Sequence, residues 1–198
     1  MKLEETTRSG VRGLAAATVV LVALVVSACG SSGTSASSSS DFAWLRPVPA
    51  PGGWLGARVP SGAAIAFPPG WHLIHGDRGT ATAALFDARR QFLGYLNLTP
   101  RQGSETSSDW ATFRVRHNAE EGDREVRSDG AATNLRFRNG RGSCVRDTYT
   151  TSSNARYEEI ACLVVGRHAA SVVVGAAPVA RWSEEQSVIE REISATTT

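Results

Sequence analysis

Residues 134–176 constrain the fold more than any other part of the chain, because three turn signals separate strand-like segments there. Asn139-Gly140 is the first, and this dipeptide favours two-residue β-hairpin turns, in which both positions take positive φ. We expect a second turn centred on Ser153 and a third at Gly166-Arg167. The spacing therefore predicts consecutive antiparallel strands, each paired with the next.

Two cysteines flank the second turn at equal distances. If that turn is centred on Ser153, Cys144 lies directly opposite Cys162 on the neighbouring strand. In a non-hydrogen-bonded antiparallel pair, opposed residues are close enough for a disulfide. Without a supporting histidine cluster the same cysteines would make a poor metal site. The register predicts a Cys144–Cys162 disulfide.

The same register makes two further pairs. Tyr149 would face Tyr157, and Asp147 would face Glu159. Like charges directly opposite each other are slightly destabilising, so the acidic pair counts against this register.

Residues 160–165 and 169–174 are apolar on both strand faces. Strands of this kind are central in a sheet that is covered on both sides, so we expect helices on each face.

Two segments have the pattern of such helices. One begins after Asp109 and ends at Gly122, and the other begins with a capping box formed by Ser183 and Gln186. Glutamates in the first turn of the second helix suit its positive N-terminus. The apolar faces would be formed by Trp110, Phe113 and His117 in the first helix and by Ile189 and Ile193 in the second.

The N-terminal half of the domain mixes irregular chain with strands. Residues 41–60 contain four prolines and two tryptophans, which predicts an extended, irregular segment that packs Trp44 and Trp54 onto the domain. Strands are expected at 63–67, 71–75, 80–86, 92–98 and 124–128. The predicted fold class is α+β, with a mostly antiparallel β-sheet of roughly six or seven strands flanked by helices on both faces.

The N-terminus combines basic residues, an apolar run at 14–26 and Cys29 after Val26-Ser27-Ala28. This arrangement resembles a bacterial lipoprotein signal, which implies cleavage before Cys29 and lipid on its sulfur and amino group. An ordinary secretory cleavage site and an uncut anchor remain alternatives. We expect a signal peptide at 1–28, a lipidated cysteine with a Ser-rich flexible tether at 29–40, and one α+β domain at 41–198.

Charge argues against nucleic-acid binding. The chain has 21 basic and 19 acidic residues, and removing the three basic and two acidic residues of 1–28 leaves 18 and 17, a net charge of +1. A nucleic-acid-binding domain is usually strongly basic. Lys2 is the single lysine, and abundant Arg, Ala, Gly and Val resemble the products of GC-rich genomes such as those of actinobacteria.

The order of elements is similar to that of the PsbP-like fold. A Pro69-Gly70-Trp71 turn follows a short strand, strands and a helix come next, and a meander and a last helix lie around Ala176-Ala177-Pro178. The resemblance covers about residues 60–196. It implies a binding or assembly accessory and provides no catalytic residue to transfer.

No pattern of catalytic or metal-ligating residues stands out. The histidines are His72, His75, His117 and His168, and the first two would point to opposite faces of one strand. The nucleophile-elbow, zinc-protease and phosphate-loop motifs do not occur. We therefore expect no catalytic residue, no metal and no cofactor.

Three arginines form a candidate anion-contact patch. With Asn139-Gly140 as the turn, Arg138 would face Arg141, and Arg136 would lie two residues along on the same side. Three guanidinium groups there would bind phosphates or carboxylates. The alternative is a solubilising edge that discourages strand pairing.

These observations predict a lipoprotein held at the outer face of the plasma membrane by the lipid on Cys29. It would act as a non-catalytic binding or accessory module whose partner is an envelope protein or a small ligand, with no role in nucleic-acid binding. Two alternatives stay open: a small-molecule carrier that uses a cleft between sheet and helix, and an enzyme of unrecognised type.

Overall fold

The computed structural model describes residues 41–167 and 169–198. The predicted signal peptide, the tether with Cys29, and His168 lie outside the described residues. The described elements are β1 (Leu55–Arg58), β2 (Ala64–Phe67), β3 (His72–Ile74), β4 (Ala81–Phe86), β5 (Phe92–Pro100), α1 (Trp110–Glu120), β6 (Arg124–Phe137), β7 (Gly140–Thr150), β8 (Arg156–Gly166), β9 (Ala170–Pro178), a 3₁₀ turn (Val179–Arg181) and α2 (Trp182–Ala195).

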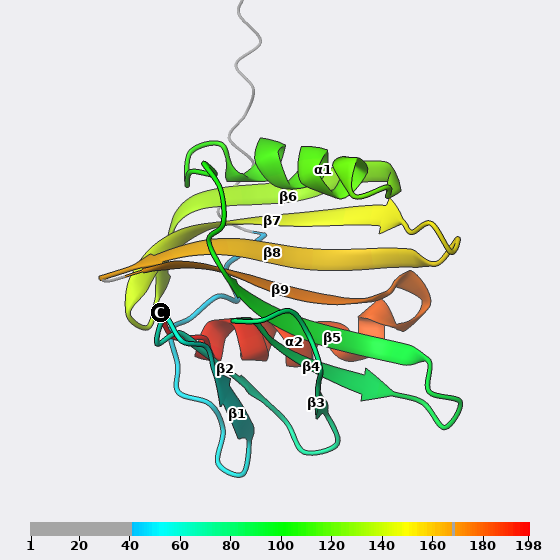
Figure 1. Ribbon diagram of the computed structural model, residues 1–198, viewed down its shortest axis with the longest axis horizontal. Coiled ribbons are helices and arrows are strands. Elements are labelled where there is room, and N and C mark those ends of the chain that lie inside the picture. Colours follow the sequence, from blue (N-terminus) through cyan, green and yellow to red (C-terminus); the bar gives the residue numbers. More distant parts are fainter. Residues whose placement is uncertain (1–40, 168) are drawn as a thin grey trace, which may run out of the picture. The chain divides into compact units, whose positions relative to one another are not determined.

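Seven of these strands form one antiparallel sheet in the order β3-β4-β5-β9-β8-β7-β6 (Figure 1). The doubly apolar strands β9 and β8 lie in its interior, as their sequences predict, because both of their faces are covered. The predicted α+β class is confirmed, and the sheet expected to have six or seven strands has seven.

The predicted register between β7 and β8 is also confirmed. Cys144 pairs with Cys162, Tyr149 with Tyr157 and Asp147 with Glu159. The cysteine sulfurs form a disulfide, with 2.08 Å between the Sγ atoms. The Cα atoms of the two cysteines are 4.1 Å apart, as in a narrow antiparallel pair.

Each face of the sheet packs against one helix. Helix α2 lies against β9, β5 and β2, and its Ile189 and Ile193 join the core that contains the disulfide. Helix α1 lies against β6, β7 and β8, and its Trp110 packs on Val145 and Ala161. Because successive strand residues point to opposite faces, Cys144 and its neighbour Val145 belong to different cores.

The expectation of irregular chain throughout 41–60 was wrong at its end. Residues 55–58 form β1, which pairs with β2 in a separate two-stranded sheet, with Leu55 opposite Phe67. Most of β1 is exposed, so it has no alternation of apolar and polar residues to reveal it. Trp44 does pack against the domain core, as predicted.

The expected Asn139-Gly140 turn is shifted by one residue. Phe137 pairs with Gly140, so the two-residue loop is Arg138-Asn139, and Gly140 belongs to β7 without positive φ. A Cβ on residue 140 would lie 2.4 Å from the Val165 carbonyl oxygen. The glycine is therefore needed for close strand packing, not for the turn.

The expected capping box of α2 is absent. The 3₁₀ turn runs directly into the helix, so Arg181 takes the N-cap position and no side chain caps the helix there. Ser183 lies inside the first turn, and Gln186 Nε2 donates instead to Glu190 Oε1 at 2.7 Å. Glu184 and Glu185 occupy the first turn, as predicted.

Candidate functional site

Helix α1 covers only part of its face of the sheet. It packs over β6, β7 and β8, and a cleft of about 450 Å³ lies between it and the neighbouring strands β5 and β9. The strands provide a floor of alternating residues, namely Tyr95, Asn97, Thr99, Val172 and Val174. The sheet is wider than the helix that covers this face, so a hollow forms beside the helix.

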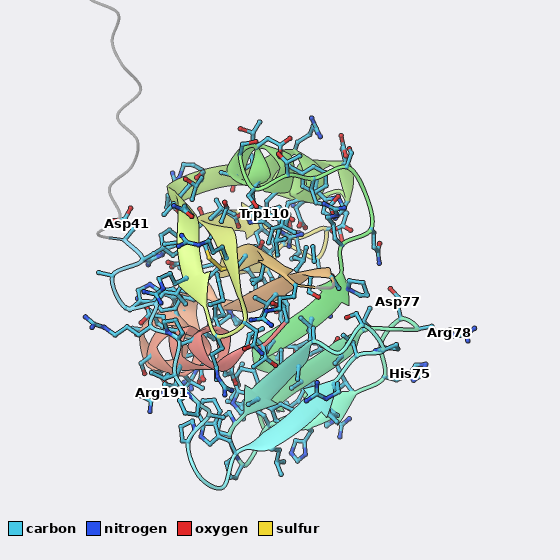
Figure 2. The ribbon with its side chains drawn as sticks, turned by 90° about the vertical axis from the view of Figure 1, so that its left-hand side faces the viewer. Asp41, His75, Asp77, Arg78, Trp110 and Arg191 are labelled. Atoms are coloured by element: carbon cyan, nitrogen blue, oxygen red, sulfur yellow. A yellow bond between two sulfur atoms is a disulfide. The ribbon has the colours of Figure 1, made fainter. Side chains whose placement is uncertain are left out.

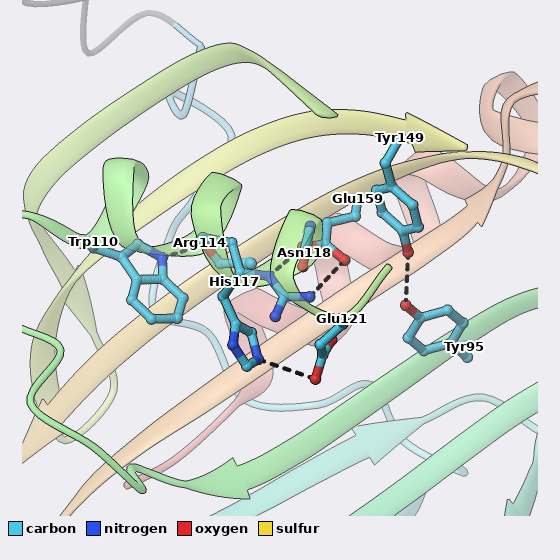
Figure 3. Close-up of polar contacts among 9 residues, drawn as sticks. Tyr95, Trp110, Arg114, His117, Asn118, Glu121, Tyr149 and Glu159 are labelled. Carbon is cyan, nitrogen blue, oxygen red and sulfur yellow. Dashed lines mark hydrogen bonds and ion pairs between the residues drawn. The ribbon is translucent and has the colours of Figure 1, made fainter. Parts of the chain in front are cut away.

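One wall of the cleft is a stack of rings on α1. The rings of Trp110 and Phe113 are 5.8 Å apart at 21°, and those of Phe113 and His117 are 5.6 Å apart at 15°. Spacings of three and four residues place side chains on one helix face. Trp110 Nε1 also donates to the Ala161 carbonyl oxygen at 2.8 Å, which attaches the helix to β8 (Figure 3).

Arg114 joins this wall to a buried carboxylate. Its Nε donates to Glu159 Oε1 at 2.6 Å and its Nη2 donates to Glu159 Oε2 at 3.0 Å (Figure 3). Glu159 is completely buried, and Arg114 lines the cleft. A two-pronged contact of this kind fixes the guanidinium plane and therefore the inner wall.

Asp147 lies beside this pair without a cation of its own. It is completely buried opposite Glu159, and neither of its carboxyl oxygens has a hydrogen-bond partner. Burial, and then the charge of Glu159, raise the pKa of Asp147 to about 8. One guanidinium thus faces two carboxyl groups, and the raised pKa of Asp147 favours its protonated form.

Tyrosines extend the polar floor. The hydroxyl oxygens of Tyr95 and Tyr149 are 3.1 Å apart, and burial raises the pKa of both (Figure 3). The rings of Tyr149 and Tyr157 stack with centroids 5.9 Å apart. Beyond Tyr95 lies a second hollow of about 390 Å³ that Tyr149, Tyr157 and Asp123 line. Tyr95 borders both hollows.

The loop that leads into α1 adds Glu105, which is 5% exposed, to the lining of the cleft. Its Oε1 accepts a hydrogen bond from the Gln102 N–H at 3.2 Å, whereas its Oε2 has no partner. A Cβ on residue 103 would lie 2.7 Å from that Oε2, so Gly103 makes room for the carboxylate. Asp77, on the loop between β3 and β4 (Figure 2), is also one of the residues that line the cleft.

The predicted arginine patch is elsewhere, on the hairpin of β6 and β7. Arg136 pairs with Arg141, whereas Arg138 lies in the loop and does not oppose Arg141, because the turn is shifted by one residue. All three side chains are exposed, and Arg141 Nη1 donates to Asn134 Oδ1 at 2.6 Å. None of the three lines the cleft.

The histidines have different surroundings. His72 and His75 are exposed, whereas His117 is half-buried in the cleft wall, with Nε2 3.2 Å from Glu121 Oε1. Among residues 41–167 and 169–198, no three His, Cys, Asp or Glu side chains are grouped in the manner of metal ligands.

The sequence suggested a cleft between sheet and helix only as an alternative and did not place it, although two signals of its inner wall were present. Asp147 and Glu159 lie opposite each other, which counted against the predicted register of β7 and β8. The two residues in fact form the base of a buried polar cluster. Arg114 lies one turn after Trp110 on the helix, the position from which it reaches Glu159. Glu105 gave no signal, because its burial depends on the path of a loop.

Comparisons with known proteins establish the fold. No family model matches the chain, and no curated protein matches it. The solution structure of cyanobacterial PsbP (CyanoP) from Synechocystis sp. PCC 6803 is similar, with a TM-score of 0.51 and 14% identity over 74% of this chain and 92% of that one. The described part of the chain therefore has the PsbP-like fold that its order of elements predicts.

Two weaker likenesses accompany it. A point mutant of the protein Mog1 has a TM-score of 0.47 and 11% identity, over 72% of this chain and 87% of that one. LpqN of Mycobacterium tuberculosis, described as involved in cell envelope biogenesis, has a TM-score of 0.39 and 12% identity, over 73% and 90%. Within the described residues, no helix has the length and apolarity needed to cross a membrane.

Proposed function

We propose that this protein is a lipid-anchored binding module of the cell envelope that holds a small molecule in the cleft beside α1. The observation that carries the proposal is the cleft itself, with an aromatic wall on α1 and a floor of Tyr95, Asn97 and Thr99. The location rests on the resemblance of the segment before Cys29 to a lipoprotein signal.

The dimensions of the cleft suit a small ligand. Small-molecule sites are concave, enclose about 300–1,000 Å³, and combine apolar walls with a few polar groups. This cleft has about 450 Å³ and both kinds of lining. Its walls are held by the Trp110–Ala161 hydrogen bond and the Arg114–Glu159 contact, so the site is formed in advance of binding.

A small ligand is better supported than a protein partner bound through an apolar surface. Among the described residues, the large apolar side chains that are exposed come from five different elements: Leu55, Leu73, Phe92, Val165 and Val179. Protein-binding patches are usually contiguous. The cleft instead brings aromatic and polar groups together in one place.

Catalysis is the second candidate, and the buried titratable cluster is what favours it. Arg114 and Tyr95 line the cleft, and Asp147 and Glu159 lie in the same cluster, where shifted pKa values are typical of active sites. Neither carboxyl group lines the cleft, however. We therefore assign the cluster a structural role, which is to attach α1 to the sheet.

The anchor is tested by Cys29→Ala. We expect the variant to be released from membranes or to keep its signal peptide, since the lipid is attached to this sulfur. Fractionation and gel mobility identical to those of the wild type would contradict the lipoprotein assignment.

The cleft is tested by filling it. Thr99 lies half-buried on the floor, and Thr99→Trp would occupy the space of a ligand. We expect mass spectrometry to find a small molecule with the wild-type protein extracted from membranes and to lose it in this variant. Thr133→Trp, at an exposed position of β6, is the matched control. Thermal unfolding of both variants checks that they are folded. Unchanged capture in Thr99→Trp, or no captured molecule in the wild type, would count against the proposal.

A further inference from the structure

The cleft carries more acidic groups than its cations can neutralise. We infer that its ligand is an organic cation, a protonated amine joined to a flat apolar group. This inference rests on the proposed function and specifies the class of ligand.

The charges around the cleft are one-sided. Asp77, Glu105 and Glu121 border it. Its basic side chains are Arg114, which is bound to Glu159, and His117, which contacts Glu121. The domain as a whole is balanced, since residues 41–198 hold 18 of the 21 basic and 17 of the 19 acidic residues. The negative balance is therefore a property of this site.

The second hollow continues the same pattern. Asp123 is its one charged lining residue, and the other side chains are aromatic, aliphatic or hydroxyl-bearing. Burial, and then the charges of Glu121 and Glu159, raise the pKa of Asp123, as expected where carboxylates accumulate. An anionic ligand would meet repulsion along both hollows, whereas a cation would relieve it.

Glu105 marks the position of the ligand's charge. It is 5% exposed, lines the cleft, and has Oε1 bonded to a backbone N–H and Oε2 without a partner. A buried carboxylate with an unused oxygen is costly unless a cation or donor meets it. No arginine of the cleft reaches Glu105, because Arg114 is committed to Glu159.

The opposite surfaces supply contact for the apolar part of the ligand. Phe113 lies on one side, and Val172 and Val174 lie on the floor. A charged group at the Glu105 end and a flat ring between helix and strands would thus use both kinds of lining. The class of ligand follows from this combination.

Three probes with one ring system and different charges test the inference. Tryptamine, tryptophol and indole-3-propionate are respectively cationic, neutral and anionic, and each is titrated into the full-length protein in detergent by isothermal calorimetry. We expect tryptamine to bind at least about tenfold more tightly than indole-3-propionate, with tryptophol between them, because the acidic lining favours a cation. A tenfold difference in affinity corresponds to about 1.4 kcal/mol. Titration into detergent alone and into Thr99→Trp corrects for partitioning.

A matched pair of variants locates the charge. Glu105→Gln removes one negative charge at nearly constant shape, and we expect it to reduce the preference for tryptamine about threefold or more. Glu120→Gln is the control, since Glu120 is exposed on α1, pairs with Arg116 and does not line the cleft. A preference unchanged in Glu105→Gln would overturn the assignment.

The outcomes separate this inference from the proposed function. Equal binding of the three probes, or tighter binding of indole-3-propionate, overturns the cation and leaves the cleft as a small-molecule site. Failure of all three to bind, while a molecule still copurifies with the wild type, overturns the inference alone. Failure to bind with nothing copurifying overturns the proposed function as well.

Discussion

The two faces of the sheet come from the same strands and differ in how they are closed. On the α2 face, Leu96, Leu98, the disulfide and Ile189 form a core with almost no exposed area. On the α1 face, the strands present Asp147, Glu159 and the tyrosines, and Arg114 of the helix donates to Glu159. The difference shows that apolar packing seals one face, whereas a smaller apolar core and a polar attachment on the other leave room for a cleft.

The apolar face also contains buried acidic residues, Glu185 and Glu192. Glu192 on α2 is completely buried, and neither of its carboxyl oxygens has a partner. Burial, and then the charge of Glu185, raise the pKa of Glu192 to about 9. A raised pKa thus favours the protonated form of Glu192 on the α2 face, as it does for Asp147 on the α1 face, and the α1 face in addition pairs the Glu159 carboxylate with an arginine.

The largest effect is expected where the polar attachment is broken. Arg114→Met leaves Glu159 and Asp147 buried without a cation, and removing one partner of a buried pair costs about 3–5 kcal/mol. Urea unfolding measures the loss. Arg116→Met, which removes an exposed pair with Glu120, should change the unfolding free energy by less than about 0.5 kcal/mol. Equal effects of the two substitutions would contradict the role of Arg114.

The second largest effect tests the tightness of the α2 face. A Cβ on residue 175 would lie 2.5 Å from Ile189 Cγ2, so Gly175→Ala must displace the buried Ile189 side chain or the helix that carries it. We expect a loss of about 1–3 kcal/mol, as for other overpacked cores. In Gly56→Ala the nearest atom would be 3.5 Å away, so this control should be tolerated. A neutral Gly175→Ala would show that α2 is loosely packed.

A third effect is the pH dependence that both faces share. The folded-state pKa values of Asp147, about 8, and Glu192, about 9, exceed the ordinary values of 3.8 and 4.5. At pH values between about 4 and about 8–9, the folded chain holds protons on these two groups that the unfolded chain releases. Their contribution to the free energy of unfolding is therefore greatest below pH 4 and is lost as the pH rises through 8–9. We expect at least about 1 kcal/mol less stability at pH 8 than at pH 5, since one pKa unit corresponds to about 1.4 kcal/mol.

Substitutions at these carboxyl groups separate the two contributions. Asp147→Asn and Glu192→Gln should each flatten the dependence, and Glu120→Gln, at an exposed position, should not. Urea unfolding at several pH values provides the measurement. A wild-type stability that increases from pH 5 to pH 8 would show that other groups dominate.

The smallest effect concerns the arginines outside both cores. Replacing Arg136, Arg138 and Arg141 by Ser should change stability by less than about 0.5 kcal/mol each, because all three are exposed. If they form an anion-contact patch, the triple variant should bind vesicles containing anionic lipids more weakly than the wild type. Unchanged vesicle binding leaves the solubilising edge as their role.

The register of β7 and β8 shows how much of the fold was predictable. Symmetry about Ser153 placed Cys144 opposite Cys162 and Asp147 opposite Glu159, because the residues of one hairpin are local in sequence. The neighbouring hairpin was displaced by one residue, since Gly140 also packs against Val165 of a third strand. A turn dipeptide carries no information about that contact.

The sequence by itself determined both helices, most of the strands other than β1, and the face that the residues of β7 and β8 occupy, because these follow from periods of two and 3.6 residues. Only the tertiary structure decided where α1 lies across the sheet, and hence that a cleft opens over β5 and β9. That position depends on contacts between distant residues: Trp110 with Ala161, 51 positions away, and Arg114 with Glu159, 45 positions away. Local patterns specify what a helix buries, whereas packing against distant strands specifies what it leaves open.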